Sequence, residues 1–193
     1  LVTEYPLCRK AAPQLTVNAN KNILAPLHPS LRRRADDLAR EFAAAQPFRH
    51  VIIEPFLDEA FCRELIAQFP RFSEKHALNE RGEVGRKAVV SQLADISLAY
   101  KQFDTLLQDS GFLELIGQIT GIPRLLYDPE YIGGGTHENL SGQELDTHVD
   151  FNYPPRTKTH RRLNLLLFLN SEWDASWGGC LELLPSPFGG EGK

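Results

Sequence analysis

The sequence contains no methionine, and it begins at Leu1. A translated chain normally starts with methionine, so we expect this sequence to be part of a longer protein. Basic residues are not in excess either, because 21 lysines and arginines stand against 25 aspartates and glutamates, which gives a formal net charge of −4. A dedicated nucleic-acid-binding protein usually shows a basic excess. The composition therefore disfavours nucleic acid as a partner.

Long apolar runs and paired cysteines are also missing. No run approaches the roughly 20 apolar residues that span a bilayer, and no N-terminal segment has the charged-then-apolar order of a signal peptide. The three cysteines, Cys8, Cys62 and Cys180, are odd in number and widely spaced, which indicates free thiols in a reducing compartment. These absences predict a cytoplasmic protein without a membrane partner.

What is present is an ordinary globular composition. The chain has 193 residues, of which 42% are hydrophobic and 24% charged, and this length is typical of one domain. We expect a single domain over residues 1–193. It divides into an irregular leader (1–29), a mainly helical part (30–121), a strand-rich part (123–184) and a tail (185–193).

Apolar residues recur at helical spacing in the first half of the chain. Ser30, Asp58 and Ser110 are the expected N-caps of three helices, and Gly121 is the expected end of the last one. A short strand is expected at 51–56, and the polar, glycine-containing stretch 71–90 is expected to be a loop. The apolar stripes that predict helices span residues 31–45, 61–69, 93–107 and 112–119.

The pattern of apolar residues changes after Pro123. Short apolar or alternating runs are separated by glycine, proline and asparagine, which is typical of the strands of a sandwich or barrel. Helices followed by strands predict an α+β fold, with helices packed against a β core. The expected strands are 124–127, 131–135, 145–151, 163–170 and 180–184.

One of these strands carries the residues most suggestive of chemistry. If 145–151 is extended, Asp146, His148 and Asp150 lie on one face. An imidazole and a carboxylate two residues apart can bind one metal ion, and they supply two of the three ligands of the facial triad of non-haem iron oxygenases. Spacing alone leaves two pairings open, Asp146 with His148 and His148 with Asp150.

The surrounding motifs resemble those of the prolyl-hydroxylase-like branch of the 2-oxoglutarate- and Fe(II)-dependent oxygenases. The His-x-Asp segment is followed by an Arg-led apolar strand, a Trp-Asp turn and a Gly-Gly pair, and residues 47–57 look like that family's opening strand. The resemblance covers about residues 30–184. It implies a double-stranded β-helix (jelly roll) core, incomplete at the C-terminus, with N-terminal supporting helices. The motif residues are Arg161 or Arg162, Leu169, Asn170, Trp173, Asp174, Gly178 and Gly179.

The resemblance also implies a site. It makes His148 and Asp150 the Fe(II) ligands, and it places Leu166, Phe168 and Leu181 around 2-oxoglutarate, although plain sheet core explains these three equally well. Tyr131 can reach the same pocket, with an ordinary core role as the alternative. Ascorbate is a further candidate cofactor.

The sequence departs from the family's pattern in one respect. The family has a second, distal histidine and a basic residue beyond it, but after Asp150 this chain offers only His160, which comes too early in the order of strands. The implied activity is that of a 2-oxoglutarate-dependent dioxygenase that hydroxylates a protein residue, an amino acid or a small metabolite. The alternative is a catalytically inactive truncated fragment or pseudo-enzyme that acts at most as a binding module. Nothing in the sequence indicates an oligomeric state.

Overall fold

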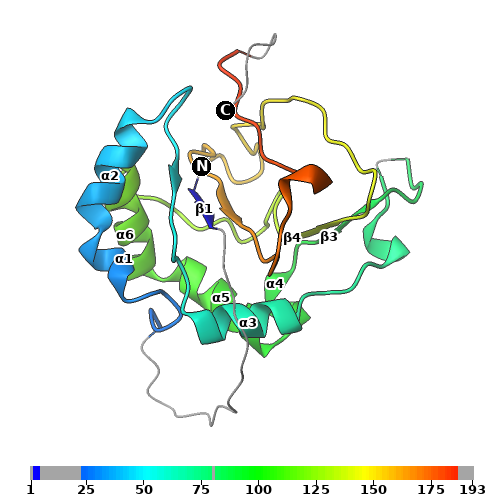
Figure 1. Cartoon of the computed structure of the whole chain (residues 1–193), viewed down its shortest axis with the longest axis horizontal. Helices are drawn as coiled ribbons and strands as arrows, with labels where there is room; N and C mark the ends of the chain where they lie inside the picture. The colour runs from blue at the N-terminus through cyan, green and yellow to red at the C-terminus, as the bar shows by residue number, and fades with distance from the viewer. Residues whose placement is uncertain (1, 5–22, 80, 187–193) are drawn as a thin grey trace.

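A computed structural model describes residues 2–4, 23–79 and 81–186 of the chain. Helices gather on the left and along the bottom of the molecule in Figure 1, and the chain after residue 121 fills the upper right. Most of the expected leader, Cys8 and the end of the tail lie outside the described residues. The structure therefore mixes helix and strand, as the sequence predicts.

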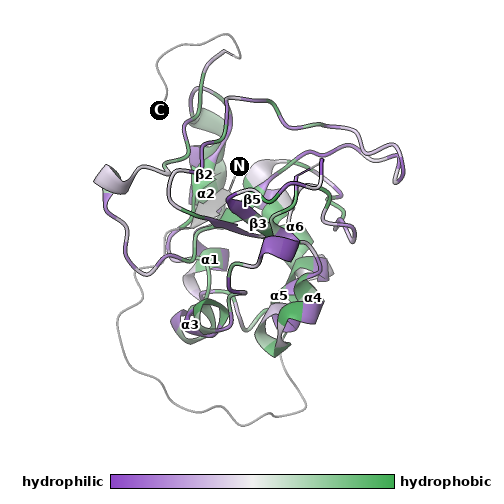
Figure 2. Ribbon diagram, turned by 90° about the vertical axis from the view of Figure 1, so that its right-hand side faces the viewer, coloured by the Kyte–Doolittle hydropathy of each residue, from purple (hydrophilic) through white to green (hydrophobic). Residues whose placement is uncertain are grey.

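All four apolar stripes form helices, so these predictions are confirmed. The first stripe is divided between α1 and α2, and the third between α4 and α5. In Figure 2, hydrophobic and hydrophilic residues alternate along α3, α4 and α5, as expected of helices with one buried face. The helices are α1 (Ser30–Arg33), α2 (Ala35–Ala44), α3 (Glu59–Ala67), α4 (Leu93–Ile96), α5 (Leu98–Gln108) and α6 (Ser110–Thr120), with short 3-10 helices η1 (Glu74–His76) and η2 (Ala175–Trp177).

The predicted end signals are confirmed at two positions. The carboxylate of Asp58 accepts hydrogen bonds from the backbone N–H groups of Ala60 and Phe61, at 3.0 and 3.3 Å, and so caps α3. Gly121 ends α6 with a positive φ of 67°, a conformation that glycine adopts without steric cost.

Two predicted caps are wrong. Ser30 is the first residue of α1 and makes no cap, since its hydroxyl bonds the ring of His28 at 2.8 Å. Ser110 is likewise already helical, and Asp109 before it caps α6. The third stripe is interrupted at Ser97, which is extended and caps α5 through its hydroxyl. At Ser30 and Ser110 a preceding polar side chain, that of His28 or Asp109, accepts a backbone hydrogen bond at the start of the helix.

The hydrophobic core lies almost wholly in the helical part. Its buried members run from Leu27 to Ile119, and α2 packs against α6 while α3 and α6 pack against α5. Among described residues after Gly121, only Thr136 and Pro154 are buried. The C-terminal part reaches the core through partly buried leucines, including Leu163, Leu165, Leu167 and Leu169.

Two small sheets connect the parts of the chain. β1 (Val2–Glu4) lies between β2 (Val51–Ile52) and β5 (Leu165–Leu167) and pairs with both in parallel, with Thr3 opposite Ile52 and Leu166. β3 (Lys87–Val90) pairs antiparallel with β4 (Thr136–Asn139). The residues expected to form a loop at 71–90 thus include η1 and β3, so that prediction is wrong in part.

The strand-rich part is less regular than predicted. Residues 124–127, 131–135, 145–151 and 180–184 form no strand, and β5 occupies only the middle of 163–170. A strand requires a neighbour for its backbone hydrogen bonds and cover for its apolar face. Leu145 and Val149 are instead 71% and 79% exposed. The jelly roll is therefore not shown by the described residues.

Two further expectations can be compared with the structure. Cys62 is buried and Cys180 is exposed, while Cys8 lies outside the described residues, so the expected reducing compartment stays a prediction. No helix among the described residues is long and apolar enough to cross a membrane.

Candidate metal centre

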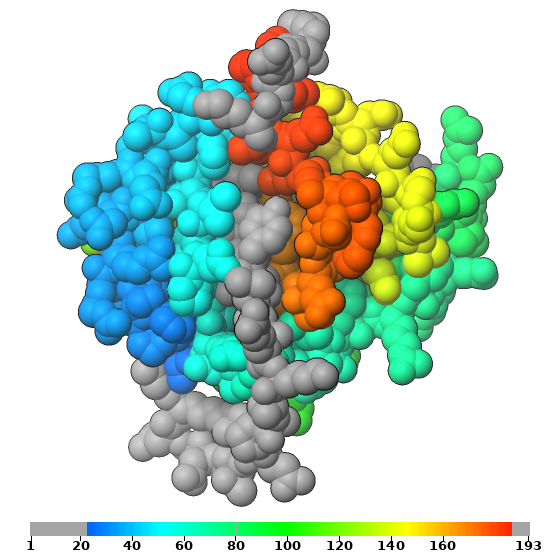
Figure 3. Space-filling view, in the orientation of Figure 1, coloured from blue at the N-terminus to red at the C-terminus, as the bar shows by residue number. Residues whose placement is uncertain are grey.

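The His-x-Asp segment lies in an irregular stretch on the surface rather than in a strand. In the space-filling view the neighbourhood of residue 150, in yellow, and the segment of η2, in orange, both reach the visible face (Figure 3). The side chains of His148 and Asp150 are about half exposed, at 50% and 43%. A ligand can therefore reach both from solvent.

The ring of His148 is oriented by a local backbone contact. Its Nδ1 atom lies 2.7 Å from the carbonyl oxygen of Asp146. A carbonyl oxygen only accepts, so Nδ1 carries the proton and donates it. In the neutral ring this leaves Nε2 with its lone pair, and such a bond from the other nitrogen is the usual support of a metal-binding histidine.

The free nitrogen of His148 faces a carboxylate. Nε2 lies 3.5 Å from Oδ1 of Asp150. Nitrogen and oxygen ligands sit about 2.1 Å from a divalent transition metal, so two of them can be up to about 4.2 Å apart around one ion. The observed separation therefore fits a shared metal. Spacing left two pairings open, and the structure brings together the side chains of His148 and Asp150. Asp146 meets the ring of His148 through its backbone carbonyl.

A third ligand is not found nearby. Within residues 2–4, 23–79 and 81–186, no group of three or more histidines, cysteines, aspartates or glutamates is arranged to hold a metal ion. His160, the one histidine that follows Asp150 in the sequence, packs its ring against Tyr153 with centroids 5.1 Å apart. The pair thus supplies two ligands, and metal binding by His148 and Asp150 stays a prediction.

The second carboxylate oxygen of Asp150 contacts two residues that precede β5. Oδ2 accepts a hydrogen bond from Nδ2 of Asn164 at 2.5 Å, and Nη1 of Arg161 lies 3.9 Å away. Nε of Arg161 in turn donates to Oδ1 of Asn164 at 2.8 Å. Sequence reasoning missed Asn164. The feature of the sequence that could have indicated Asn164 is that it is the single polar residue inside the apolar run 163–169.

Two of the predicted pocket residues share a face with Asn164. Leu163, Leu165, Leu167 and Leu169 pack against the core. Because side chains alternate along an extended chain, Asn164, Leu166 and Phe168 point to the opposite side, the side on which Asn164 contacts Asp150. Leu166 and Phe168 are partly buried there, so their predicted place beside His148 and Asp150, the proposed metal pair, is compatible with the structure.

The other two predicted pocket residues are placed differently. Leu181 is 41% exposed. Tyr131 donates a hydrogen bond from its hydroxyl group to Oδ1 of Asp104 on α5, at 2.7 Å. The hydroxyl group is therefore directed to the helical part of the molecule. Burial raises the pKa of Tyr131 above its ordinary value, and the hydrogen bonds with Tyr127 and Asp104 act in the same direction.

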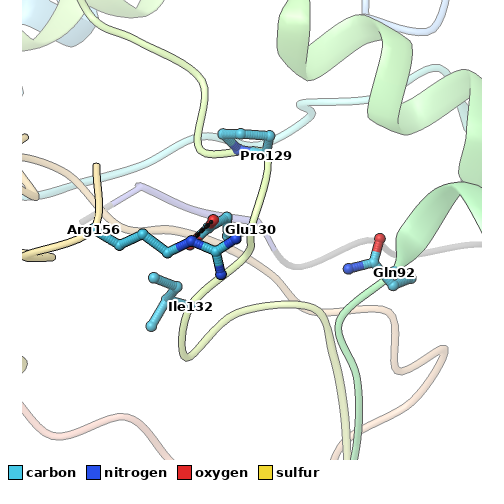
Figure 4. Close-up of a pocket in the computed structure, with 5 residues that line it drawn as sticks. All are labelled: Gln92, Pro129, Glu130, Ile132 and Arg156. Atoms are coloured by element: carbon cyan, nitrogen blue, oxygen red, sulfur yellow. Dashed lines mark ion pairs between the residues drawn. The ribbon is translucent and has the colours of Figure 1, made fainter.

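One cavity of the molecule shares no lining residue with the predicted site. It has a volume of about 510 Å³, and Nε of Arg156 forms an ion pair with Oε1 of Glu130 at 3.0 Å on one side of it. Figure 4 shows Gln92 on the opposite side from the ion pair, with Pro129 above that pair and Ile132 below it. None of these five residues was predicted as part of the site.

Comparison with known proteins adds a similarity over part of the chain. Residues 135–190 match the 2OG-Fe(II) oxygenase superfamily. This span includes His148, Asp150, Arg161 and Asn164. No curated protein and no solved structure matches the chain. The match supports a dioxygenase-type function with Fe(II) and 2-oxoglutarate, and the superfamily implies a jelly-roll fold.

Proposed function

We propose that this chain carries the iron-binding segment of an Fe(II)- and 2-oxoglutarate-dependent dioxygenase, specifically a hydroxylase of the prolyl-hydroxylase-like branch. The observation that carries the proposal is the approach of His148 Nε2 to Asp150 Oδ1, 3.5 Å apart, inside the span that matches the superfamily. The substrate we propose is a residue of a protein, a free amino acid or a small metabolite.

The roles of the two ligands follow from their contacts. In the neutral ring, His148 would present Nε2 with its lone pair to a metal, while Nδ1 donates to the Asp146 carbonyl. Asp150 presents a carboxylate oxygen that is held toward His148 while its second oxygen is hydrogen-bonded. When bound, Fe(II) would supply the coordination positions at which 2-oxoglutarate and dioxygen react.

The proposed pocket for 2-oxoglutarate is formed by Leu166, Phe168, Leu181 and Tyr131. Leu166 and Phe168 are supported by their position on the same side of the strand as Asn164. They would provide an apolar wall that excludes water from the reacting atoms. Tyr131 would first have to release Asp104, so its role is the one that the structure supports least.

The test is turnover of 2-oxoglutarate to succinate by the purified chain, with Fe(II) and ascorbate present. We expect the wild-type chain to form succinate and His148→Ala to form none. His160→Gln is the matched control, because His160 lies outside the pair, against Tyr153. Equal succinate formation by the wild-type chain and His148→Ala would remove the catalytic proposal.

The same experiment addresses the alternative of an inactive binding module. Metal binding that depends on His148 and Asp150, without succinate formation by the wild-type chain, would support that alternative. The observation in its favour is that no third ligand is found among the described residues.

A further inference from the structure

The segment that follows Asp150 carries formal charge of one sign only. Between residues 151 and 171 there are four arginines and lysines and no aspartate or glutamate, although the whole chain has a net charge of −4. All four lie in residues 151–162, which we name the basic loop: Arg156, Lys158, Arg161 and Arg162. A local excess of positive charge produces a field that attracts acidic partners to that part of the surface.

The basic loop is closed by its own backbone. The N–H group of Arg161 donates to the carbonyl oxygen of Asn152 at 2.8 Å, and the N–H group of Lys158 donates to the carbonyl oxygen of Pro154 at 3.0 Å. Pro154 is itself buried and so fixes the base of the loop. The side chains are therefore displayed on an ordered backbone, which lowers the entropy that a partner loses the protein on binding.

Three of the four cations face solvent. Arg156, Lys158 and Arg162 are exposed, whereas Arg161 is 23% exposed. Arg156 is already paired with Glu130, as Figure 4 shows. Among the described residues, no carboxylate lies at ion-pair distance from Lys158 or Arg162. These two cations are therefore available to the carboxylates of a partner.

The aromatic side chains of the basic loop favour a polypeptide over a nucleic acid. The ring of Tyr153 packs against His160, with centroids 5.1 Å apart, and Cζ of Arg161 lies 4.9 Å from the centroid of the Phe151 ring. Single-stranded nucleic acids bind where bases stack on aromatic rings beside cations. Both rings have a partner within the loop, whereas an acidic polypeptide needs only the cations.

The basic loop begins and ends beside the proposed metal pair. It starts directly after Asp150 in the sequence, and Nη1 of Arg161 returns to within 3.9 Å of Oδ2 of Asp150. A polypeptide held on the loop therefore has its neighbouring residues close to Asp150 and His148. This proximity connects the charge of the loop with the choice of substrate.

We propose that the basic loop binds an acidic stretch of polypeptide through Lys158 and Arg162, and that this stretch flanks the residue that the protein hydroxylates. Of the three substrate classes named above, this selects a residue of a protein. The substrate assignment rests on the proposed function, but the binding of the acidic stretch does not.

The experiment measures binding of a fluorescently labelled peptide, Glu-Glu-Pro-Glu-Glu, to the purified chain by fluorescence anisotropy, without added metal. The comparison peptide has glutamine in place of every glutamate. Low ionic strength is used because exposed charges are then least screened. We expect the acidic peptide to bind more tightly than the glutamine peptide. The double variant Lys158→Glu with Arg162→Glu should weaken binding of the acidic peptide by about 10-fold or more, because attraction becomes repulsion.

A matched double variant controls for net charge. Arg33→Glu with Lys75→Glu changes the net charge by the same amount at exposed positions on α1 and η1. We expect it to change the affinity by less than about twofold, since distant exposed charges are screened. Thermal unfolding shows whether each variant is folded. If the charge reversal does not fold, Lys158→Gln with Arg162→Gln replaces it and should weaken binding in the same direction.

The outcomes separate this inference from the proposed function. Equal binding of the two peptides, or an equal loss in the matched control variant, would overturn the binding role of the loop. Tighter binding of a labelled oligothymidylate than of the acidic peptide would overturn the choice of a polypeptide. Succinate formation by a chain whose peptide binding ignores Lys158 and Arg162 would keep the dioxygenase and overturn this inference. Loop-dependent peptide binding without succinate formation would keep the binding role and overturn the substrate assignment.

Discussion

The hydroxyl group of Tyr131 donates a hydrogen bond of 2.7 Å to Oδ1 of Asp104, a residue 27 positions earlier in the chain. Tyr127 donates to the same oxygen at 2.6 Å, and Gln108 donates to Oδ2 at 2.7 Å. Asp104 is 9% exposed, so its carboxylate accepts hydrogen bonds from three protein donors in place of water. The segment that follows α6 is thereby fastened to α5.

Removing this acceptor should destabilise the fold more than removing one donor. Tyr131→Phe loses one hydrogen bond to a charged group, and we expect it to lower the free energy of unfolding by about 2 kcal/mol. Asp104→Leu leaves three donors without their acceptor, and we expect it to lower the free energy of unfolding by more than Tyr131→Phe does. Urea unfolding measures both, with Tyr153→Phe as a control, because Tyr153 is 44% exposed. Equal effects of all three changes would contradict the prediction.

Alkaline pH should unfold the protein through its tyrosines. Burial, followed by the hydrogen bond with Asp104, raises the pKa of Tyr127 to about 12, and burial also raises the pKa of Tyr100 and Tyr131. An unfolded tyrosine ionises near pH 10, so the unfolded chain loses protons first and the free energy of unfolding falls as pH rises above about 10. Phenolate absorption should show that Tyr100, Tyr127 and Tyr131 ionise only as the structure is lost. Ionisation of all tyrosines near pH 10 in an intact fold would contradict this.

Acid should weaken the β3–β4 sheet through His137. Burial and the charge of Lys87 lower the pKa of His137, and a hydrogen bond to the backbone of Gly134 opposes them. The folded state thus favours the neutral ring, so stability is complete above the unfolded pKa of 6.5 and declines as pH falls below it. His137→Gln should flatten the dependence of unfolding free energy on pH between 7 and 5, and Lys87→Gln should reduce it. An unchanged slope in His137→Gln would refute the prediction.

Gly135 should not tolerate a side chain. Its φ is +110°, and a Cβ atom there would lie 2.3 Å from the carbonyl oxygen of Val90 and 2.7 Å from Cα of Ser91. Because these are backbone atoms at the end of β3, the strands would have to separate. We expect Gly135→Ala to cost on the order of 3 kcal/mol. Gly134→Ala is the control, since its nearest contact would be an ordinary 3.5 Å to Tyr131. Similar stability of the two variants would contradict this reading.

His148→Ala should separate binding from folding. The side chain is half exposed, and its contacts are with Asp146 and Asp150 in its own segment. We expect loss of Co(II) and Fe(II) binding together with a change in unfolding free energy of less than about 0.5 kcal/mol. Calorimetric titration and thermal unfolding of the same preparation measure the two effects. A large loss of stability would show that the ring has a structural role.

The helices could be predicted because their signals are local. The stripe that follows Asp58 and the glycine at 121 act within a few residues of the structures that they specify. The errors at Ser30 and Ser110 are shifts of one residue, since Pro29 and Asp109 also fit a helix start. The break in the third stripe depends on the hydroxyl of Ser97, which caps α5, and a periodicity cannot show such a contact.

The strands and the surroundings of the metal pair were harder to predict because they depend on distant partners. The alternation in 145–151 predicted a strand, but alternation does not supply a neighbouring strand. The His148 and Asp150 pair was visible in the sequence because its members are two residues apart. The contact between Asn164 and Asp150 spans 14 residues and requires the chain to turn back, so no spacing rule indicated it.

The position of β1 has a consequence for the order in which the protein can be assembled. β2 and β5 do not pair with each other, because β1 lies between them and bonds to both. Val2 pairs with Leu165, a contact across most of the chain's length, and contacts so far apart form slowly. During synthesis the helical core can pack as soon as α6 has emerged, but the three-stranded sheet must wait until Leu167 is available. The segment around β5 is therefore anchored late, by a strand that is synthesised well before it.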